Sequence, residues 1–215
     1  MMAPQDSKVP VRLAGRLAAL VVLAAMGAGG ALVTRHLEAP ALHDSYVRAV
    51  ADDSGTTAGV KVAMVLGSFY ESSGRHIGAP YADRLGKGQP LTVCNGITGD
   101  GVIAGRWYSP ADCYALERGR YLLAERQARQ LLVHWETYDP FVQGQFIDFV
   151  HNKGAGSLAT STLLRKANAG DLAGACRENR RWNRGTIRGV STVLPGLQLR
   201  GEANGEICLE WRVVP

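Results

Sequence analysis

The chain has 215 residues, 46% of them hydrophobic, and a formal net charge of +5. This length allows one domain with a sizeable core plus an extension, and the ordinary composition excludes fibrous and wholly disordered proteins. The positive charge favours an anionic partner. No basic cluster alternates with aromatic residues, so a nucleic-acid partner is not expected; an anionic cell wall, or simply a solvated basic surface, fits the charge equally well.

The first distinctive feature is an uncharged stretch of 17 residues, Leu17 to Val33. As a helix it would span roughly 26 Å at about 1.5 Å per residue, slightly less than the ~30 Å hydrocarbon core of a bilayer. Residues 26–31 are mostly Gly and Ala, which contribute little transfer free energy and weaken a helix. We therefore expect residues 1–36 to contain a hydrophobic helix that anchors weakly in a membrane and can leave it.

The charges around this stretch predict its orientation. Lys8, Arg12 and Arg16 precede it and only Arg35 follows closely, so the N-terminus should remain cytoplasmic and the rest of the chain should be exported. Two alternatives to the weak anchor stay open. Small residues around Gly27 would suit a signal peptidase, which would make the stretch a cleaved signal, and a permanent anchor is the other alternative.

All four cysteines, Cys94, Cys113, Cys176 and Cys208, lie beyond this stretch, as expected for a protein that enters an oxidising compartment. The sequence has no CxxC motif and no histidine pair at zinc spacing, so no structural metal is expected. Four cysteines allow three pairings. We expect Cys94 to pair with Cys113 and Cys176 with Cys208, each bond contributing about 3 kcal/mol; four free buried thiols are the alternative.

The first part of the exported domain is predicted to combine a buried helix with a small β region. Apolar residues recur from Val60 to Phe69, which favours a helix that runs up to Glu71, although valine-rich runs also form strands. Eight glycines and two prolines lie within residues 74–107, a composition typical of hairpins and turns. Short apolar segments that suit strands occur at 91–93 and 101–103.

Helix start and stop signals mark a helical lobe in the second half of the chain. Ser109-Pro110 and Asp139-Pro140 each combine an N-cap residue with proline at the first helical position. Glycines at 154 and 170 follow helically spaced apolar residues and are expected to end helices. The predicted helices run from Pro110 to before Thr137, from Pro140 to before Gly154, from Ser161 to Ala169, from Asp171 to Trp182, and from Glu202 to Trp211.

These elements predict an α+β domain with a small β-hairpin lobe, a larger helical lobe and a cleft between them. The domain is expected at residues 58–215. Residues 37–57 are expected to be a connector, with a short helix possible near 45–51, and residues 1–36 the membrane segment.

Residues 149–182 read FVHNKGAGSLATSTLLRKANAGDLAGACRENRRW. This stretch resembles the C-terminal helical part of the phage-type lysozymes, glycoside hydrolase family 24, in its aromatic-Val-x-Asn-x-Gly-x-Gly turn, its STLLRK-x-N-x-GD run and its Cys176 to Trp182 helix. The ending Gly196-Leu197-x-x-Arg200 also resembles the family's, with Gly201 in place of a second arginine. The resemblance covers about residues 59–211 and implies a lysozyme-like fold.

The resemblance also implies which residues carry the chemistry. Glycoside hydrolysis uses a protonated carboxyl on one side of the bond and a carboxylate on the other, and apolar surroundings favour the protonated one. Glu71 follows the apolar helix and would be the general acid; its alternative is a solvated carboxylate at a helix end. Pro80-Tyr81-Ala82-Asp83 resembles the family's Tyr-x-Asp. Asp83 would therefore orient water, with the Thr92 hydroxyl helping to hold it, unless Asp83 is an ordinary turn residue.

The spacing of these three residues departs from the family pattern. Eleven residues separate Glu71 from Asp83, and eight separate Asp83 from Thr92, three more than in the family each time. An odd insertion within a strand would turn its side chains to the other face. The additions must therefore lie in turns, and the glycines and prolines at 78–80 and 86–90 allow this.

Four other positions also bear on the site. Ile97 stands where the family has a histidine, which removes at most a structural polar contact. Asp100 is a rival carboxylate, but Asp100-Gly101 is typical of a hairpin turn. Asn152 would contact the saccharide if the motif holds, or else satisfy a buried backbone turn. Trp182 would form a wall of the cleft or belong to the core.

The resemblance therefore implies a phage or prophage endolysin, similar to those with a signal-anchor-release segment. It would hydrolyse the β-1,4 bond between N-acetylmuramic acid and N-acetylglucosamine in peptidoglycan during host lysis. It would act as a monomer at the periplasmic face of the inner membrane and then in the periplasm, without a metal or cofactor. The alternatives are a lytic transglycosylase that needs only Glu71, and a wall-binding module without catalytic activity.

Overall fold

The computed structural model describes residues 42–72, 75–83, 88–187 and 189–210. All of them fall within one compact unit, Pro40–Pro215. The predicted membrane helix at 17–33 lies outside the described residues. Among the helices that are described, none is both long and apolar enough to cross a bilayer.

The described residues form an α+β fold in which helices predominate, as predicted. The helices are α2 (Leu42–Asp52), α3 (Ala58–Ser72), α4 (Pro110–Leu131), α5 (Pro140–Lys153), α6 (Ala155–Ala159), α7 (Thr162–Asn168), α8 (Leu172–Glu178) and α9 (Pro195–Glu210), with short 3-10 turns η1 (Trp135–Thr137) and η2 (Asn179–Arg181). The strands are β1 (Tyr81–Ala82), β2 (Leu91–Val93), β3 (Ile97–Thr98), β4 (Arg184–Ile187) and β5 (Val190–Val193).

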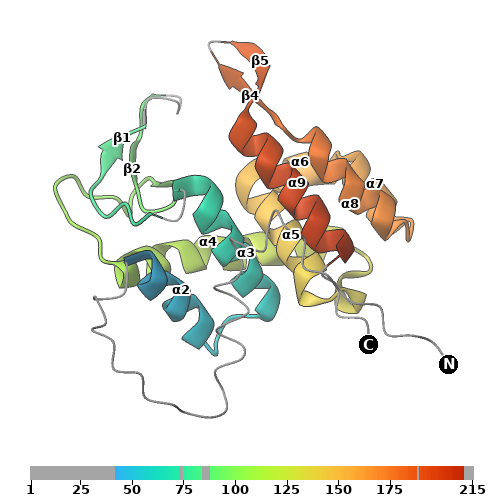
Figure 1. The fold of residues 1–215 in the computed structure, drawn as a ribbon, viewed down its shortest axis with the longest axis horizontal. Coiled ribbons are helices and arrows are strands. Elements are labelled where there is room, and N and C mark those ends of the chain that lie inside the picture. The colour runs from blue at the N-terminus through green and yellow to red at the C-terminus, as the bar shows by residue number, and fades with distance from the viewer. Residues whose placement is uncertain (1–41, 73–74, 84–87, 188, 211–215) are drawn as a thin grey trace, which may run out of the picture. The chain divides into compact units, whose positions relative to one another are not determined.

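The first three strands form a small antiparallel sheet in the order β1-β2-β3. Thr92 is its central residue, because it pairs with Tyr81 on one side and with Thr98 on the other. Figure 1 shows β1 and β2 close to the C-terminal end of α3. The predicted strand at 101–103 is absent from the structure; this segment follows a turn and a bend at 99–101 and runs without strand pairing.

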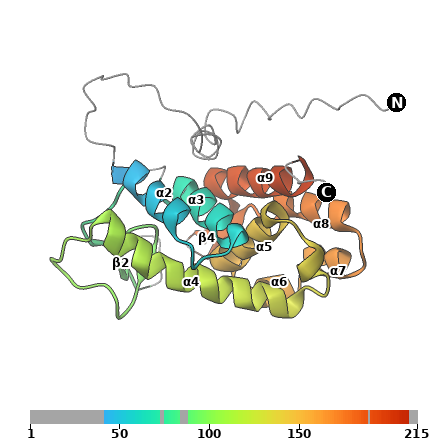
Figure 2. The same ribbon diagram turned by 90° about the horizontal axis from the view of Figure 1, so that it is seen from below.

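Helix α4 links the two parts of the fold. It runs from the small sheet to α6 along the whole lower edge of the view in Figure 2. Its start is the predicted one: Ser109 accepts a hydrogen bond from the Asp112 backbone, and the Asp112 side chain accepts one from the Ser109 backbone. Such a reciprocal capping box satisfies two backbone donors that the helix leaves unpaired.

Helix α5 is the centre of the helical lobe, and most of its side chains are buried. Asp139 caps its N-terminus by accepting from the backbone of Phe141 and Val142. A Cβ atom at Gly144 would lie 2.6 Å from the Val62 side chain of α3. The glycine is therefore what allows α3 and α5 to pack so closely.

Two further features differ from the sequence prediction. Helix α9 begins at Pro195 rather than at Glu202, because Gly196 and Gly201 lie inside the helix instead of before it. A Cβ at Gly201 would be 2.6 Å from the Asn179 carbonyl oxygen, so this glycine permits a close helix contact. The β4–β5 hairpin was not predicted. Helix α2 packs on α3 and α4, with Tyr46 only 3% exposed, so it is part of the compact unit.

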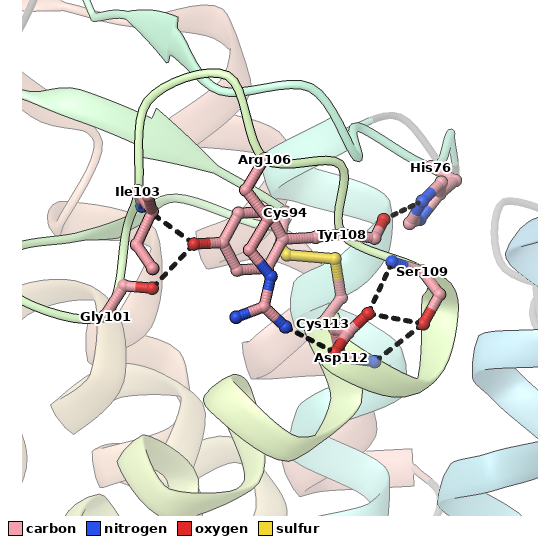
Figure 3. Close-up of polar contacts among 9 residues, drawn as sticks. All are labelled: His76, Cys94, Gly101, Ile103, Arg106, Tyr108, Ser109, Asp112 and Cys113. Carbon is pink, nitrogen blue, oxygen red and sulfur yellow. Dashed lines mark hydrogen bonds and ion pairs between the residues drawn. A yellow bond between two sulfur atoms is a disulfide. The ribbon is translucent and has the colours of Figure 1, made fainter.

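Both predicted disulfides are confirmed. Cys94 bonds Cys113, with their Cα atoms 5.4 Å apart, and Cys176 bonds Cys208, with theirs 5.6 Å apart. The first joins the turn after β2 to α4, and the second joins α8 to α9. Figure 3 shows the first bond beside Tyr108, whose hydroxyl donates to the Gly101 carbonyl and accepts from the Ile103 backbone.

Candidate active site

A cleft of about 470 Å³ contains the Glu71 side chain. Four parts of the fold line it: the end of α3, the turn after β2, one face of α4, and the end of α5. The α4 residues recur at the three- and four-residue spacing of a single helix face. The lining residues are Glu71, Asn95, Gly96, Arg120, Leu123, Ala124, Gln127, Val150, His151 and Asn152.

Glu71 is held by a buried arginine that comes from far along the chain. The Arg200 side chain of α9 is 5% exposed and pairs with Glu71, whose side chain is 27% exposed. The other side of the guanidinium binds Asp148 of α5 through two hydrogen bonds of 2.9 and 2.7 Å, and Asn204 donates to the same carboxylate at 2.8 Å. Burial disfavours the charge on Arg200, but Asp148 and Glu71 outweigh this and raise its pKa. One carboxylate oxygen of Glu71 is therefore fixed in position.

The turn after β2 lies against the other side of Glu71. A Cβ atom at Gly96 would lie 3.6 Å from Glu71 Oε2, and Gly96 has a φ of +80°. Glycine adopts this left-handed conformation without the strain that a side chain would cause. The main chain can therefore approach the carboxylate closely at this point.

Asp83 and Thr92, the other two predicted catalytic residues, are linked through the Pro90 carbonyl at the small sheet, where Asp83 follows β1 and Thr92 lies in β2. The Pro90 carbonyl accepts both from the Asp83 backbone at 3.0 Å and from the Thr92 hydroxyl at 3.1 Å. Thr92 is 2% exposed. Neither residue is among those that line the Glu71 cleft.

The Tyr81 phenol is affected by the charges of both carboxylates, Asp83 and Glu71. Burial raises its pKa, and the negative charges of Asp83 and Glu71 raise it further. Both carboxylates therefore act on the same phenol, which is 42% exposed. This observation relates Asp83 to Glu71 more directly than the sequence spacing does.

His151 is a cleft residue that the sequence analysis did not single out. Its ring stacks on Tyr121 of α4, with centroids 4.0 Å apart and planes 7° from parallel. Burial lowers the pKa of His151, although the Asp148 and Glu71 carboxylates oppose this effect. Its Nδ1 atom and the Tyr121 hydroxyl are both buried without a hydrogen-bond partner among the described residues. The sequence did contain a signal for this residue, because His151 directly follows a run of core positions in α5.

The two predicted saccharide contacts are placed differently. Asn152 lines the cleft together with Glu71. Trp182 does not; it is partly buried and packs edge-to-face on Phe149 at 4.9 Å between centroids. Trp182 and Asn152 both line a second, much smaller cavity beside Arg200.

One group of possible metal ligands lies among the described residues. Cys94, Cys113 and Glu117 lie close enough together to hold an ion. The two sulfur atoms are bonded to each other, and a disulfide does not supply the thiolates that a metal requires. Only one carboxylate of this group remains as a ligand.

A carboxyl at a helix end that faces a cleft can act as one of the two carboxylic acids that glycoside hydrolysis uses. The Phage lysozyme family model matches residues 77–204, a range that includes Asp83 and Asn152 and begins after Glu71.

Named relatives agree with this match. The chain is 35% identical to the SAR-endolysin of Bacteriophage PS119 over 170 residues, which cover 79% of this chain and 95% of that protein. It is 38% identical to the SAR-endolysin of Enterobacteria phage PA-2 over 130 residues, or 60% and 73% of the two chains. The chain therefore belongs to the phage lysozyme family.

Solved structures show the same fold. The active form of the P1 phage endolysin Lyz has a TM-score of 0.60 and 21% identity, with 84% of this chain and 96% of that chain covered. The endolysin of Escherichia coli O157:H7 phage FAHEc1 has a TM-score of 0.62 and 17% identity, with 76% and 98% covered.

Proposed function

We propose that the chain is an endolysin that hydrolyses the β-1,4 bond between N-acetylmuramic acid and N-acetylglucosamine in peptidoglycan. The observation that carries this proposal is the Glu71 carboxyl, which ends an apolar helix and faces a cleft large enough for sugar rings. A carboxyl in this position can protonate the glycosidic oxygen as the bond breaks. Membership of the phage lysozyme family supports the same reaction.

The remaining parts of the reaction are assigned to residues around Glu71. Arg200 fixes the glutamate, so that its free oxygen points to the leaving group. Asp83, steadied by the hydrogen bonds at Pro90, presents a water molecule from the opposite face of the sugar, and Thr92 supports it. Asn152 contacts the saccharide from α5, while Trp182 mainly supports Phe149 behind the cleft. A carboxyl separation of about 6.5–9.5 Å in the substrate complex would agree with inversion.

We also propose that Leu17–Val33 anchors the chain in the inner membrane, with the enzyme domain on the periplasmic side, and later releases it. The support is the Gly/Ala-rich composition of this segment and the SAR-endolysin names of the relatives. Release would give the cleft access to the wall.

One exchange tests the catalytic role of Glu71. Glu71→Gln should fold normally and lose nearly all activity in a turbidity assay on exposed cell walls, because an amide cannot donate the proton. Glu125→Gln, which changes a carboxylate of α4 outside the cleft lining, is the matched control and should remain active. Lysis by Glu71→Gln at the rate of the control would contradict the proposal.

A lytic transglycosylase is the second candidate, because no other carboxylate is among the described residues that line the Glu71 cleft. Mass spectrometry of the muropeptides separates the two reactions: reducing ends indicate hydrolysis and anhydro ends indicate transglycosylation. A wall-binding module would instead pellet with walls and release no fragments, whichever residue occupies position 71.

A further inference from the structure

Directly behind the cleft wall lies a second carboxylate, Glu117 of α4. It is 1% exposed and takes no part in the mechanism described above. Three donors bind it: the Tyr46 hydroxyl of α2, the Asn95 backbone N–H at 3.1 Å and the Asn95 side-chain amide at 2.9 Å. Asn95 belongs to the turn that lines the Glu71 cleft.

The hydrogen bonds show which atoms donate. Burial raises the pKa of Tyr46 well above its ordinary value, and the Glu117 charge raises it further, so the phenol keeps its proton and donates it. Burial also raises the pKa of Glu117, while the hydrogen bonds from Tyr46 and Asn95 oppose this. Because an ionised carboxylate only accepts, three donors around Glu117 form a consistent set.

This set determines the orientation of the Asn95 amide. Its Nδ2 atom must face Glu117, because the reversed amide would place its oxygen against a carboxylate oxygen with no proton between them. The amide oxygen is therefore at the end that does not contact Glu117. Asn95 is 9% exposed and is among the residues that line the Glu71 cleft, so only a small part of it can meet a ligand.

The main chain of the turn is fixed as well. Cys94 has a φ of +55°, its N–H donates to the Ile77 carbonyl at 2.8 Å, and its sulfur is bonded to Cys113, one helical turn before Glu117. A rigid turn preserves the direction of a side chain, which is the condition for precise recognition.

We propose that Asn95 presents its amide oxygen to the cleft as a hydrogen-bond acceptor for an N–H or O–H group of the saccharide, and that Glu117 is the positioning residue that prevents the amide from flipping. Tyr46 holds Glu117 from behind. This inference rests on the saccharide-binding role proposed for the cleft. It adds to that role a specificity contact of defined polarity beside Glu71.

Glu117 lies near several other titratable groups. The titratable groups near it are Tyr46 of α2, Glu71 of α3, Tyr121 of α4, and Arg75 and His76, which line a small cavity with it. Glu117 and Glu71 repel each other electrostatically.

The test measures binding of the N-acetylglucosamine trimer to the full-length protein by calorimetric titration. Asn95→Ala and Glu117→Gln should each weaken binding roughly three- to tenfold, the value of one hydrogen bond. The double variant should bind no more weakly than Asn95→Ala, because Glu117 acts through Asn95.

Asp53→Asn is the matched control. Asp53 also accepts from a tyrosine hydroxyl between the end of α2 and α4, that of Tyr114, but it lies outside the cleft lining. The control should lose stability without a change in trimer affinity.

Three outcomes would overturn the inference: normal trimer binding by Asn95→Ala, an unchanged trimer affinity in Glu117→Gln, or an equal loss of binding in Asp53→Asn. A wild-type protein that neither binds the trimer nor cleaves walls would instead contradict the proposed function itself.

Discussion

At the scale of single residues, the cleft shows how burial changes the chemistry of a side chain. His151 lies between α4 and α5 with its ring stacked on Tyr121, and burial is the main reason that its pKa falls below 6.5. Arg200 shows the opposite behaviour, since two carboxylates keep it charged although it is buried. Each effect follows from partners that lie far away in the sequence.

The lowered pKa of His151 leads to a prediction about how stability depends on pH. Because its pKa is lowered in the folded state, the unfolded chain binds a proton more readily, and stability should fall as the pH drops below about 6.5 towards the folded-state pKa. His151→Phe keeps the stacked ring without the titration, so it should reduce the loss of stability between about pH 7.5 and 5.5. Urea unfolding at several pH values measures this.

His134→Phe is the control for this exchange, because His134 lies at the start of η1 outside the cleft lining. It should keep the wild-type pH dependence. Equal slopes in wild type and His151→Phe would show that His151 does not contribute.

At the scale of elements, the two disulfides join different parts of the fold. Cys176–Cys208 connects two helices of the helical lobe, α8 and α9. Cys94–Cys113 connects α4 to the turn that carries Asn95 and Gly96 beside Glu71. Both constrain the unfolded chain, but only the second supports a wall of the cleft.

Removing each bond should therefore have different effects. Cys176→Ser with Cys208→Ser should lower the free energy of unfolding by about 3–4 kcal/mol, as the loop length implies, with little effect on trimer affinity. Cys94→Ser with Cys113→Ser should cost a similar amount and also weaken trimer binding, because the turn loosens. Urea unfolding and calorimetry distinguish the two; identical binding by both double variants would contradict the assignment.

At the scale of the whole molecule, charge and hydropathy relate the domain to its surroundings. The chain carries a net charge of +5, which favours approach to an anionic wall. The proposed anchor, Leu17–Val33, has its Gly/Ala-rich part at residues 26–31. Weak hydrophobicity in this part would let the segment leave the bilayer once the membrane potential collapses.

Replacing Gly27, Gly29 and Gly30 with leucine should prevent this release. Each leucine adds apolar surface that stabilises the membrane-inserted state, so the variant should stay in the membrane fraction after an uncoupler is added, while the wild-type protein moves to the soluble periplasmic fraction. Fractionation and immunoblotting measure the distribution. Equal release of both proteins would contradict a weak anchor.

Much of the fold was predictable because its signals are local. The caps at Ser109 and Asp139, and the apolar spacing before Glu71, identified α4, α5 and α3. The start of α9 was missed because Gly196 and Gly201 normally interrupt helices, and here close packing makes glycine necessary. The β4–β5 hairpin was missed because it pairs short strands that are mostly exposed and carry no strong hydrophobic pattern.

The sequence alone determined the family resemblance and the identity of Glu71 as the candidate acid, since these depend on residue type and order along the chain. It left three cysteine pairings open, and the structure decided between them. Only the tertiary structure decided what surrounds Glu71. Arg200 lies 129 residues away from it, and the Glu117–Asn95 contact joins α4 to a turn 22 residues earlier. Such contacts form when helices pack and exclude water, and no local pattern encodes which buried charge meets which partner.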